Sequence, residues 1–217
     1  HDLEAARAGS EVHVPAADLG VRVTVPVVER ERLRRGRNGA IDDVRQQLAR
    51  APLRWCVTGG AGFIGSHLVE AYVAAGWDVT ALDDLSRGKA SQVPAGVPLI
   101  VADIRSDLAR STVATGGFEV LNHHAAQIDV RYSVERPSAD ADINIAGFVN
   151  MLEGAGAGGV RRVVFASSGG VVYGNPDLIP TPETAPKGPV SPYGVSKLAG
   201  EHYLRALGAL NGFEGVA

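Results

Sequence analysis

The hydrophobic pattern of this 217-residue chain changes near Pro52. Before that point, residues 21–25 alternate in a way typical of a short half-buried strand, and the apolar positions of residues 41–50 share one helical face. After it, short apolar runs alternate with amphipathic stretches, which predicts strands alternating with helices. We therefore interpret residues 1–52 as an appendage and residues 53–217 as one regular domain.

Five apolar runs predict the strands of the regular domain, at residues 54–58, 78–82, 98–101, 118–122 and 161–166. Helical periodicity predicts helices between and after them, at residues 63–75, 106–114 and 137–155 and around residues 193–197. Strands that alternate with helices need right-handed crossovers, which give a parallel sheet covered on both faces. We therefore expect a doubly wound α/β fold whose ligand crevice lies beyond the carboxyl ends of the strands.

The composition adds little to this picture except by exclusion. Hydrophobic residues make up 45% of the chain and charged residues 21%, which is typical of a soluble globular protein. The net charge of −3 gives no general reason to expect nucleic-acid or membrane binding. The single cysteine, Cys56, lies in a predicted strand and fits a buried thiol in a reducing cytoplasm. The sequence shows no apolar run that suits a membrane span or a signal peptide, so we expect a cytoplasmic protein.

The appendage differs from the rest of the chain in its charge. Residues 1–50 hold half of the arginines and no lysine, and the sequence begins with His1 rather than Met. Basic runs are usually exposed faces, so we interpret this segment as a solvated, tethered helix that is foreign to the regular domain. An RNA-binding or phosphate-binding arm is the alternative.

A glycine turn links the first predicted strand to the first predicted helix. Gly59, Gly62 and Gly65 follow one another at three-residue spacing. The absence of Cβ atoms lets a pyrophosphate approach backbone N–H groups, and a helix N-terminus adds partial positive charge. Alone the spacing is weak evidence, because a chain with 27 glycines also contains ordinary glycine loops. The turn predicts a dinucleotide pocket only together with residues that follow the later strands.

Acidic and small residues follow those strands. Asp83 ends the second strand, about twenty residues after the turn, where a carboxylate accepts hydrogen bonds from the ribose hydroxyls of an adenosine. This favours NAD, although Arg87 leaves room for NADP, and a plain turn residue is the alternative for Asp83. Asp103 ends the third strand, where it could face the adenine edge. Small residues in the segment 124–126 would let a cofactor lie close to the backbone.

The adjacent residues His123 and His124 raise the question of a metal site. Neighbours in a strand point to opposite faces, and the nearby sequence offers no Cys or carboxylate to complete a ligand set. We therefore expect no metal here.

Tyr193 and Lys197 stand four residues apart in the last predicted helix, so their side chains share one face. An adjacent ammonium favours the phenolate and would lower the pKa of Tyr193 from about 10. Tyr193 could then take a hydroxyl proton during hydride transfer, while Ser168, at the end of the fifth strand, hydrogen-bonds the same oxygen. A surface pair at helical spacing is the alternative for this pattern taken alone.

Taken together, these motifs resemble those of the extended short-chain dehydrogenases/reductases. The resemblance covers about residues 53–217 and is greatest to the UDP-glucose 4-epimerases and their NAD-dependent epimerase/dehydratase relatives. The motifs that carry it are TGGAGFIGSHL at 58–68, DDLS at 83–86, AAQ at 125–127, FASSGG at 165–170, VYG at 172–174 and SPYGVSK at 191–197.

The resemblance implies a Rossmann domain with tightly held NAD that takes hydride from C4 of a UDP-hexose while Tyr193 removes the O4 proton. The resulting 4-keto sugar turns and receives the hydride on its other face. Lys197 would bind the nicotinamide ribose and tune Tyr193, and Ser168 would orient or share the proton. The positions that match the family's NAD site are Gly59, Gly62, Phe63, Ile64, Gly65, Asp83, Asp103, Ile104, His124, Ala125, Ala126, Asn144 and Lys197.

Two glycines bear on the choice of reaction. Sugar 4,6-dehydratases and UDP-xylose synthases carry an acidic residue shortly after the serine or threonine, whereas Gly169 and Gly170 stand here. Without an acid to act on C5 or C6, the resemblance favours epimerisation over dehydration or another oxidoreductase reaction. A non-catalytic NAD-binding sensor or scaffold is an alternative of another class.

The resemblance also implies a part that this sequence lacks. In the family, the chain continues into a further strand, an asparagine-containing loop and a C-terminal domain for the nucleotide sugar, whereas this sequence stops at Ala217. We therefore expect these 217 residues alone to epimerise poorly or not at all. The oligomeric state stays open, although helices of such domains commonly pair across homodimers in the family.

Overall fold

The computed structural model of the chain describes residues 53–217. The strand predicted at 21–25 and the helix predicted at 41–50 lie outside these residues. The division of the chain near residue 52 stays a prediction.

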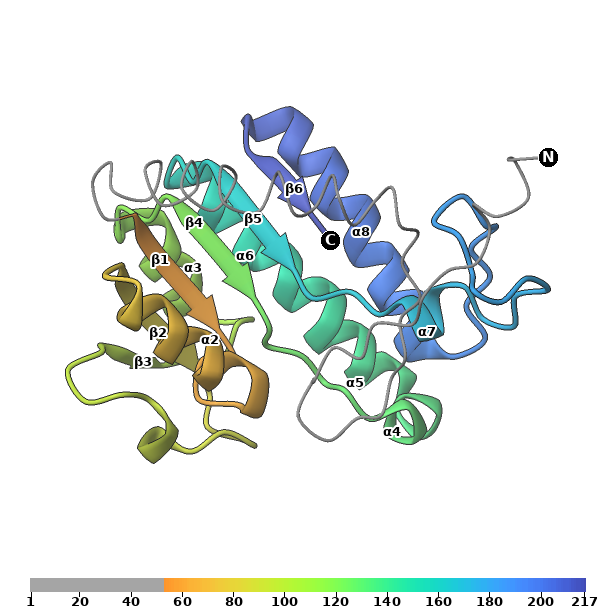
Figure 1. The fold of residues 1–217 in the computed structure, drawn as a ribbon, viewed down its shortest axis with the longest axis horizontal. Coiled ribbons are helices and arrows are strands. Elements are labelled where there is room, and N and C mark those ends of the chain that lie inside the picture. Colours follow the sequence, from red (N-terminus) through yellow and green to blue (C-terminus); the bar gives the residue numbers. More distant parts are fainter. Residues whose placement is uncertain (1–52) are drawn as a thin grey trace, which may run out of the picture. The chain divides into compact units, whose positions relative to one another are not determined.

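Six parallel strands form one sheet, in the order β3-β2-β1-β4-β5-β6 (Figure 1). They are β1 (Arg54–Thr58), β2 (Asp78–Asp83), β3 (Leu99–Val101), β4 (Val120–His123), β5 (Arg162–Phe165) and β6 (Glu214–Val216). The strand order reverses between β1 and β4, which pair so that Thr58 lies beside His123. Doubly wound sheets bind ligands at the carboxyl ends of the strands at such a switch point. The predicted doubly wound α/β fold is confirmed.

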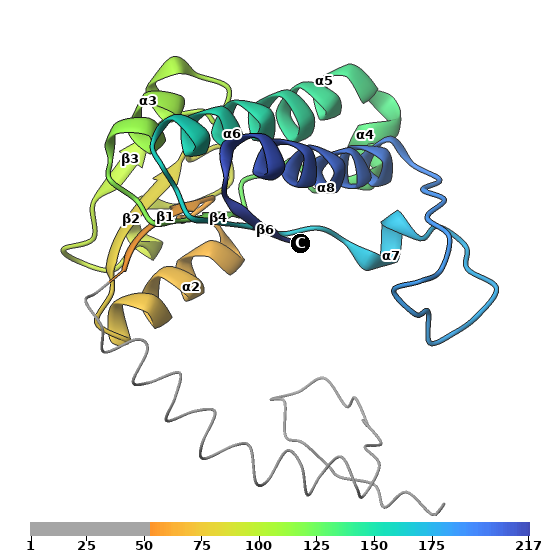
Figure 2. The same ribbon diagram turned by 90° about the horizontal axis from the view of Figure 1, so that it is seen from above.

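Helices cover both faces of the sheet (Figure 2). One face carries α2 (Phe63–Ala74), and the other carries α3 (Asp107–Thr115), α6 (Gly147–Ala157) and α8 (Pro192–Asn211). The shorter elements are the 3-10 turn η2 (Ala90–Gln92), α4 (Val130–Glu135), α5 (Pro137–Ala141), the π-helical turn η3 (Asp142–Ala146) and α7 (Gly169–Val172). Within residues 53–217, none of the helices combines the length and apolarity that crossing a bilayer needs.

Apolar side chains fill the space on both sides of β1. Cys56 belongs to the larger cluster, with Phe148 and Phe165, whereas Val57 belongs to the smaller cluster, with Val69. Successive strand residues point to opposite faces, so this one strand supports both layers. Burial raises the pKa of the Cys56 thiol to about 12, which makes it a packing residue, as its position in a strand predicted.

The structure corrects the sequence prediction in the second half of the domain. The helix predicted over 137–155 is divided into α5, η3 and α6, because the π-turn inserts an extra residue into the helical ladder. The sequence reasoning missed α4, a single short helix whose first N–H groups are capped by Asp129. It also missed β6, a three-residue strand that extends the sheet beside β5. The expectation that this sequence lacks the further strand after the last helix is therefore wrong.

Candidate functional site

The glycine turn joins β1 to α2 at the switch point of the sheet. Gly59 has a φ of +69°, and a Cβ on it would lie 2.7 Å from the amide nitrogen of Ala125. A Cβ on Gly65 would lie only 2.0 Å from the carbonyl oxygen of Gly59. The amide of Gly62 donates to the same carbonyl at 3.0 Å, which closes the turn. Glycine is therefore required at Gly59 and Gly65 by close packing, and at Gly59 also by the left-handed backbone.

The start of α2 fits a bound phosphate group. Its N-cap residue is Gly62, so no side chain caps the helix, and Phe63 and Ile64 are 78% and 60% exposed. The N–H groups of a first helical turn have no acceptor within their own helix, and the helix dipole makes this end partially positive. A turn without Cβ atoms that leads to an uncapped, exposed helix start is suited to the pyrophosphate of a dinucleotide.

Asp83 lies buried at the end of β2, directly behind this turn. One carboxylate oxygen accepts from the amide of Ala61 at 3.0 Å, and the other accepts from the amide of Leu85 at 2.8 Å. The carboxylate thus shapes the turn, as the alternative interpretation of Asp83 proposed. Each oxygen has a second lone pair, so the carboxylate keeps the capacity to accept from a ribose hydroxyl.

The segment after β3 contains an ion pair that the sequence reasoning missed. Arg105 donates from Nε to the carboxylate of Asp103 at 3.0 Å and pairs with Asp142 of η3 at 2.5 Å. The hydrogen bonds from Arg105 lower the pKa of the Asp103 carboxyl. The side chain of Ile104 is buried, and a Cβ on Gly147 would lie 2.7 Å from it. Ile104 can therefore offer a cofactor only its backbone.

The segment after β4 runs beside the glycine turn. The amide of Ala125 donates to the Thr58 hydroxyl at 3.3 Å, and Ala125 and Ala126 are both partly exposed. Burial, followed by the charge of Lys197, lowers the pKa of His124. His123 is fully buried and shares a 2.8 Å hydrogen bond with the Thr58 hydroxyl. In the part of the chain that the structure describes, His, Cys, Asp and Glu side chains form no group of three or more that could hold a metal.

Tyr193 and Lys197 face each other from the first turns of α8. The ammonium of Lys197 lies 5.7 Å from the centre of the Tyr193 ring and 4.8 Å from that of Phe165, and it donates to the carbonyl of Ala166 at 2.9 Å. Both side chains are buried, with residue exposures of 9% and 4%. The alternative of an ordinary surface pair is therefore wrong.

The pKa values of this pair differ from the sequence-based expectation. Burial raises the pKa of Tyr193, and the negative charge of Asp140 raises it further. Burial lowers the pKa of Lys197 to about 8. The expectation that the ammonium lowers the pKa of Tyr193 is wrong for this structure, because removal from water disfavours the phenolate.

Replacing Lys197 with Met is expected to stabilise the domain at neutral pH. The fall in the lysine pKa from 10.5 to about 8 corresponds to a cost on the order of 3 kcal/mol for the charged form. Because the folded-state pKa lies below the unfolded one, this cost is complete below pH 8 and disappears as the pH rises through 10.5. Urea unfolding should therefore show a more stable Met variant near pH 7 and a smaller difference near pH 10. A Met variant that is less stable than the parent near pH 7 would contradict the lowered pKa of Lys197.

Two adjacent serines at the end of β5 have different surroundings. Ser167 donates to Glu201 of α8 at 2.7 Å, and Lys187 pairs with the other carboxylate oxygen of Glu201. Ser168 is half-buried at the N-cap of α7, and its hydroxyl accepts no hydrogen bond from that helix. Of the two, Ser168 is the one whose hydroxyl is not committed to α8.

Asn144 lies within a buried polar network. Its amide accepts from the Gln127 N–H and donates to the Gln127 carbonyl, both at 2.9 Å, and also donates to Asp140 at 2.9 Å. Asn144 therefore fixes the backbone of the segment after β4 at Gln127. The sequence reasoning missed Asp140, although Asp140, Asn144 and Phe148 follow one another at four-residue spacing, which places Asp140 on the buried helix face.

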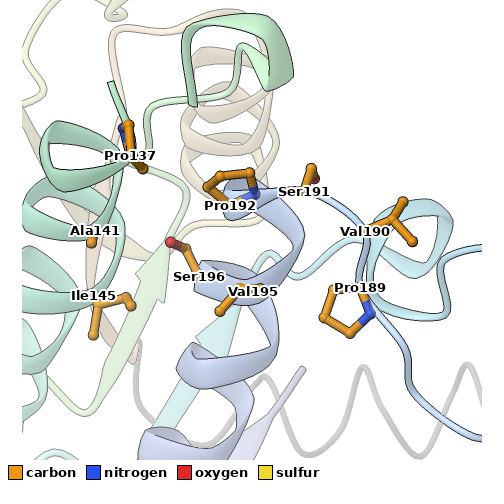
Figure 3. A pocket seen from close by; sticks show the side chains of 9 residues that line it. All are labelled: Pro137, Ala141, Ile145, Pro189, Val190, Ser191, Pro192, Val195 and Ser196. Atoms are coloured by element: carbon orange, nitrogen blue, oxygen red, sulfur yellow. The ribbon is translucent and has the colours of Figure 1, made fainter. Parts of the chain in front are cut away.

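A mostly apolar pocket of about 490 Å³ lies between α5, η3 and the start of α8 (Figure 3). Pro137 and Ala141 line one side and Val195 the other, and the hydroxyl of Ser196 points from α8 toward α5 and η3. None of the residues predicted for the cofactor or the chemistry lines this pocket, so it is distinct from the candidate site.

Residues 55–217 match the model of the NAD dependent epimerase/dehydratase family. A putative UDP-glucose 4-epimerase of Methanocaldococcus jannaschii is 44% identical over 158 residues, which cover 73% of this chain and 52% of that protein. The chain spans about half the length of the curated relatives it matches.

Two solved structures resemble this chain in both fold and sequence. The UDP-glucose 4-epimerase of Thermus thermophilus, in complex with NAD, is 44% identical with a TM-score of 0.71, over 75% of this chain and 53% of that one. The UDP-glucose 4-epimerase of Thermotoga maritima, with UDP-glucose, is 36% identical with a TM-score of 0.72, over the same shares. The chain belongs to the NAD dependent epimerase/dehydratase family.

Proposed function

We propose that this chain supplies the NAD site and the proton-transferring residues of a nucleotide-sugar 4-epimerase that interconverts UDP-glucose and UDP-galactose. The observation that carries the proposal is the buried Tyr193–Lys197 pair on a sheet whose switch point holds the glycine turn. The relatives with solved structures, one with NAD and one with UDP-glucose, support the same assignment.

Different residues around the switch point would each bind a different part of NAD. The turn Gly59–Gly65 with the first N–H groups of α2 would bind the pyrophosphate, and Asp83 would bind the adenosine ribose. Asp103 and the Ile104 backbone would flank the adenine. The segment 124–126, supported by Asn144 through Gln127, would lie along the cofactor. Lys197 would reach the nicotinamide ribose. NAD bound in this way supplies a hydride acceptor that later returns the hydride.

The chain's own side chains would handle the proton. Tyr193 as phenolate would take the proton from the sugar O4 as C4 loses its hydride, and it would return that proton after the 4-keto sugar has turned. Burial and the charge of Asp140 raise the pKa of Tyr193 in this structure, whereas Lys197, with a pKa of about 8, is mostly protonated at neutral pH. The phenolate would therefore form only in the loaded site, beside this ammonium. Ser168 would hydrogen-bond the same sugar oxygen.

Gly169 and Gly170 favour epimerisation over dehydration. They form the first turn of α7 directly after Ser168, are exposed, and place no acid beside the serine. Elimination across C5 and C6 needs such an acid, whereas redox at C4 does not.

The identity of the product tests this proposal. The chain would be incubated with NAD and UDP-galactose, and the nucleotide sugars separated by chromatography. We expect UDP-glucose to form, at a low rate. A 4-keto-6-deoxy sugar would show a dehydratase instead. Tight NAD binding with no sugar product, even after the C-terminal half of a related UDP-glucose 4-epimerase is joined to the chain, would favour the non-catalytic sensor.

Replacing Asp83 with Ala is expected to weaken NAD binding about 10-fold to 100-fold, because a hydrogen bond to a charged group contributes roughly 1.5–3 kcal/mol. NADP binding should weaken less, because the carboxylate no longer repels its 2′-phosphate. Asp84→Ala is the matched control, since Asp84 is exposed and bonds only within its own turn, to Ser86. Calorimetric titration with both cofactors measures the effect. Equal NAD affinity in the two variants would remove Asp83 from the site.

A further inference from the structure

Asp140 of α5 is a fully buried carboxylate whose hydrogen-bond partners are all neutral side chains. One of its oxygens accepts from Gln127 and from Asn144, each at 2.9 Å, and the other accepts from the Ser196 hydroxyl at 2.6 Å. Burying a charge is costly unless such bonds compensate it. We therefore looked for a role of the Asp140 carboxylate in the groups to which its hydrogen bonds lead.

The network connects Asp140 to the first turns of α8. Ser196 directly precedes Lys197, and its side chain points from α8 toward α5 and η3 (Figure 3). From α4, the hydroxyl of Ser133 accepts the backbone N–H of Tyr193 at 3.1 Å. Two buried polar contacts therefore hold the segment that carries both Tyr193 and Lys197, and only the contact from Asp140 brings a charge.

That charge acts on both residues of the pair. It raises the pKa of Tyr193 and opposes the effect of burial on the pKa of Lys197. The other titratable groups coupled to Lys197 are His123 and His124, whose pKa values are lowered. Asp140 therefore helps Lys197 to stay charged at neutral pH.

We propose that Asp140 is a positioning residue for the Tyr193–Lys197 pair, which it orients through Ser196 and to which it supplies a buried negative charge. The catalytic role of Asp140 rests on the proposed function. The effect of its charge on the titration of Lys197 can be measured without substrate or NAD.

Asp140→Asn is the main test. The Asn side chain has the same shape, its oxygen can accept from Gln127 and Asn144, and its NH₂ can donate to Ser196, so the variant removes mainly the charge. The chain contains three lysines, Lys89, Lys187 and Lys197, so ¹³C labelling at the lysine ε-carbon gives few NMR signals to titrate. We expect the titration midpoint of Lys197, about 8 in the parent, to move to lower pH.

Ser196→Ala is the second variant, and it keeps the charge while removing the hydrogen bond that orients the helix. Looser packing lets water reach Lys197, so its midpoint should rise toward the ordinary lysine value of 10.5. The two variants therefore shift one signal in opposite directions, which a merely structural Asp140 would not do.

An unchanged Lys197 midpoint in folded Asp140→Asn overturns the proposal. If that variant does not fold, an unchanged midpoint in Ser196→Ala overturns it instead. If both shifts appear but the folded parent binds no NAD, the placement stands and the proposed function fails.

Discussion

A Tyr193→Phe chain is expected to lose roughly 10²-fold to 10⁴-fold in the rate of sugar oxidation, which is the usual contribution of a positioned acid or base. Phe keeps the ring that faces Lys197 and removes only the hydroxyl that would take the O4 proton. NAD binding should stay near the parent value, because the proposed role of Tyr193 concerns the substrate proton. Single-turnover formation of reduced NAD from UDP-galactose measures the rate, and calorimetry measures the binding.

Tyr203→Phe is the matched control for that experiment. Tyr203 lies on the same helix and is 42% exposed, so losing its hydroxyl should leave the rate unchanged. A Tyr193 variant that oxidises the sugar as fast as the Tyr203 variant would remove Tyr193 from the chemistry.

A Gly65→Ala chain is expected to lose detectable NAD binding and to unfold more easily. The new methyl group would lie 2.0 Å from the Gly59 carbonyl oxygen and 2.7 Å from its carbon, and both are backbone atoms. The turn must therefore open, which costs about 1–3 kcal/mol or more by analogy with overpacked cores. Opening it also displaces the N–H groups that would contact the pyrophosphate. Urea unfolding and calorimetric titration with NAD measure the two effects.

Gly188→Ala separates this effect from the general cost of replacing a glycine. A Cβ on Gly188 would meet no atom within 4 Å, and its φ lies outside the left-handed region. The variant should therefore bind NAD and unfold like the parent. If Gly65→Ala behaved in the same way, the close packing of the turn would have no part in binding.

The sequence predicted those parts of the fold whose signals are local. The five apolar runs and the helical spacing of residues 63–75 depend on neighbours within a few residues, and they correspond to β1–β5 and α2. Short elements carry too few positions for such a pattern, which is why α4 and β6 were missed. The π-turn at η3 is accompanied by buried bonds between Asn144 and Gln127, seventeen residues earlier, and no helical periodicity contains that information.

In the candidate site too, the sequence predicted what depends on local spacing and not what depends on contacts between distant residues. The shared face of Tyr193 and Lys197 followed from their spacing, but the pKa of Tyr193 depends on burial and on Asp140, which only the tertiary structure reveals. Asp103 was expected at the end of β3, whereas its pairing with Arg105, and through it with Asp142, was not. Residue type and order indicated the chemistry, and long-range packing determines the charge states.

Calorimetric titration of the 217-residue chain with NAD tests the central claim most directly. We expect saturable binding at one site, stronger for NAD than for NADP, retained in Gly188→Ala and lost in Gly65→Ala. Absence of NAD binding by the folded chain, or equal binding by the Gly65→Ala variant, would contradict the assignment of the glycine turn as the cofactor site.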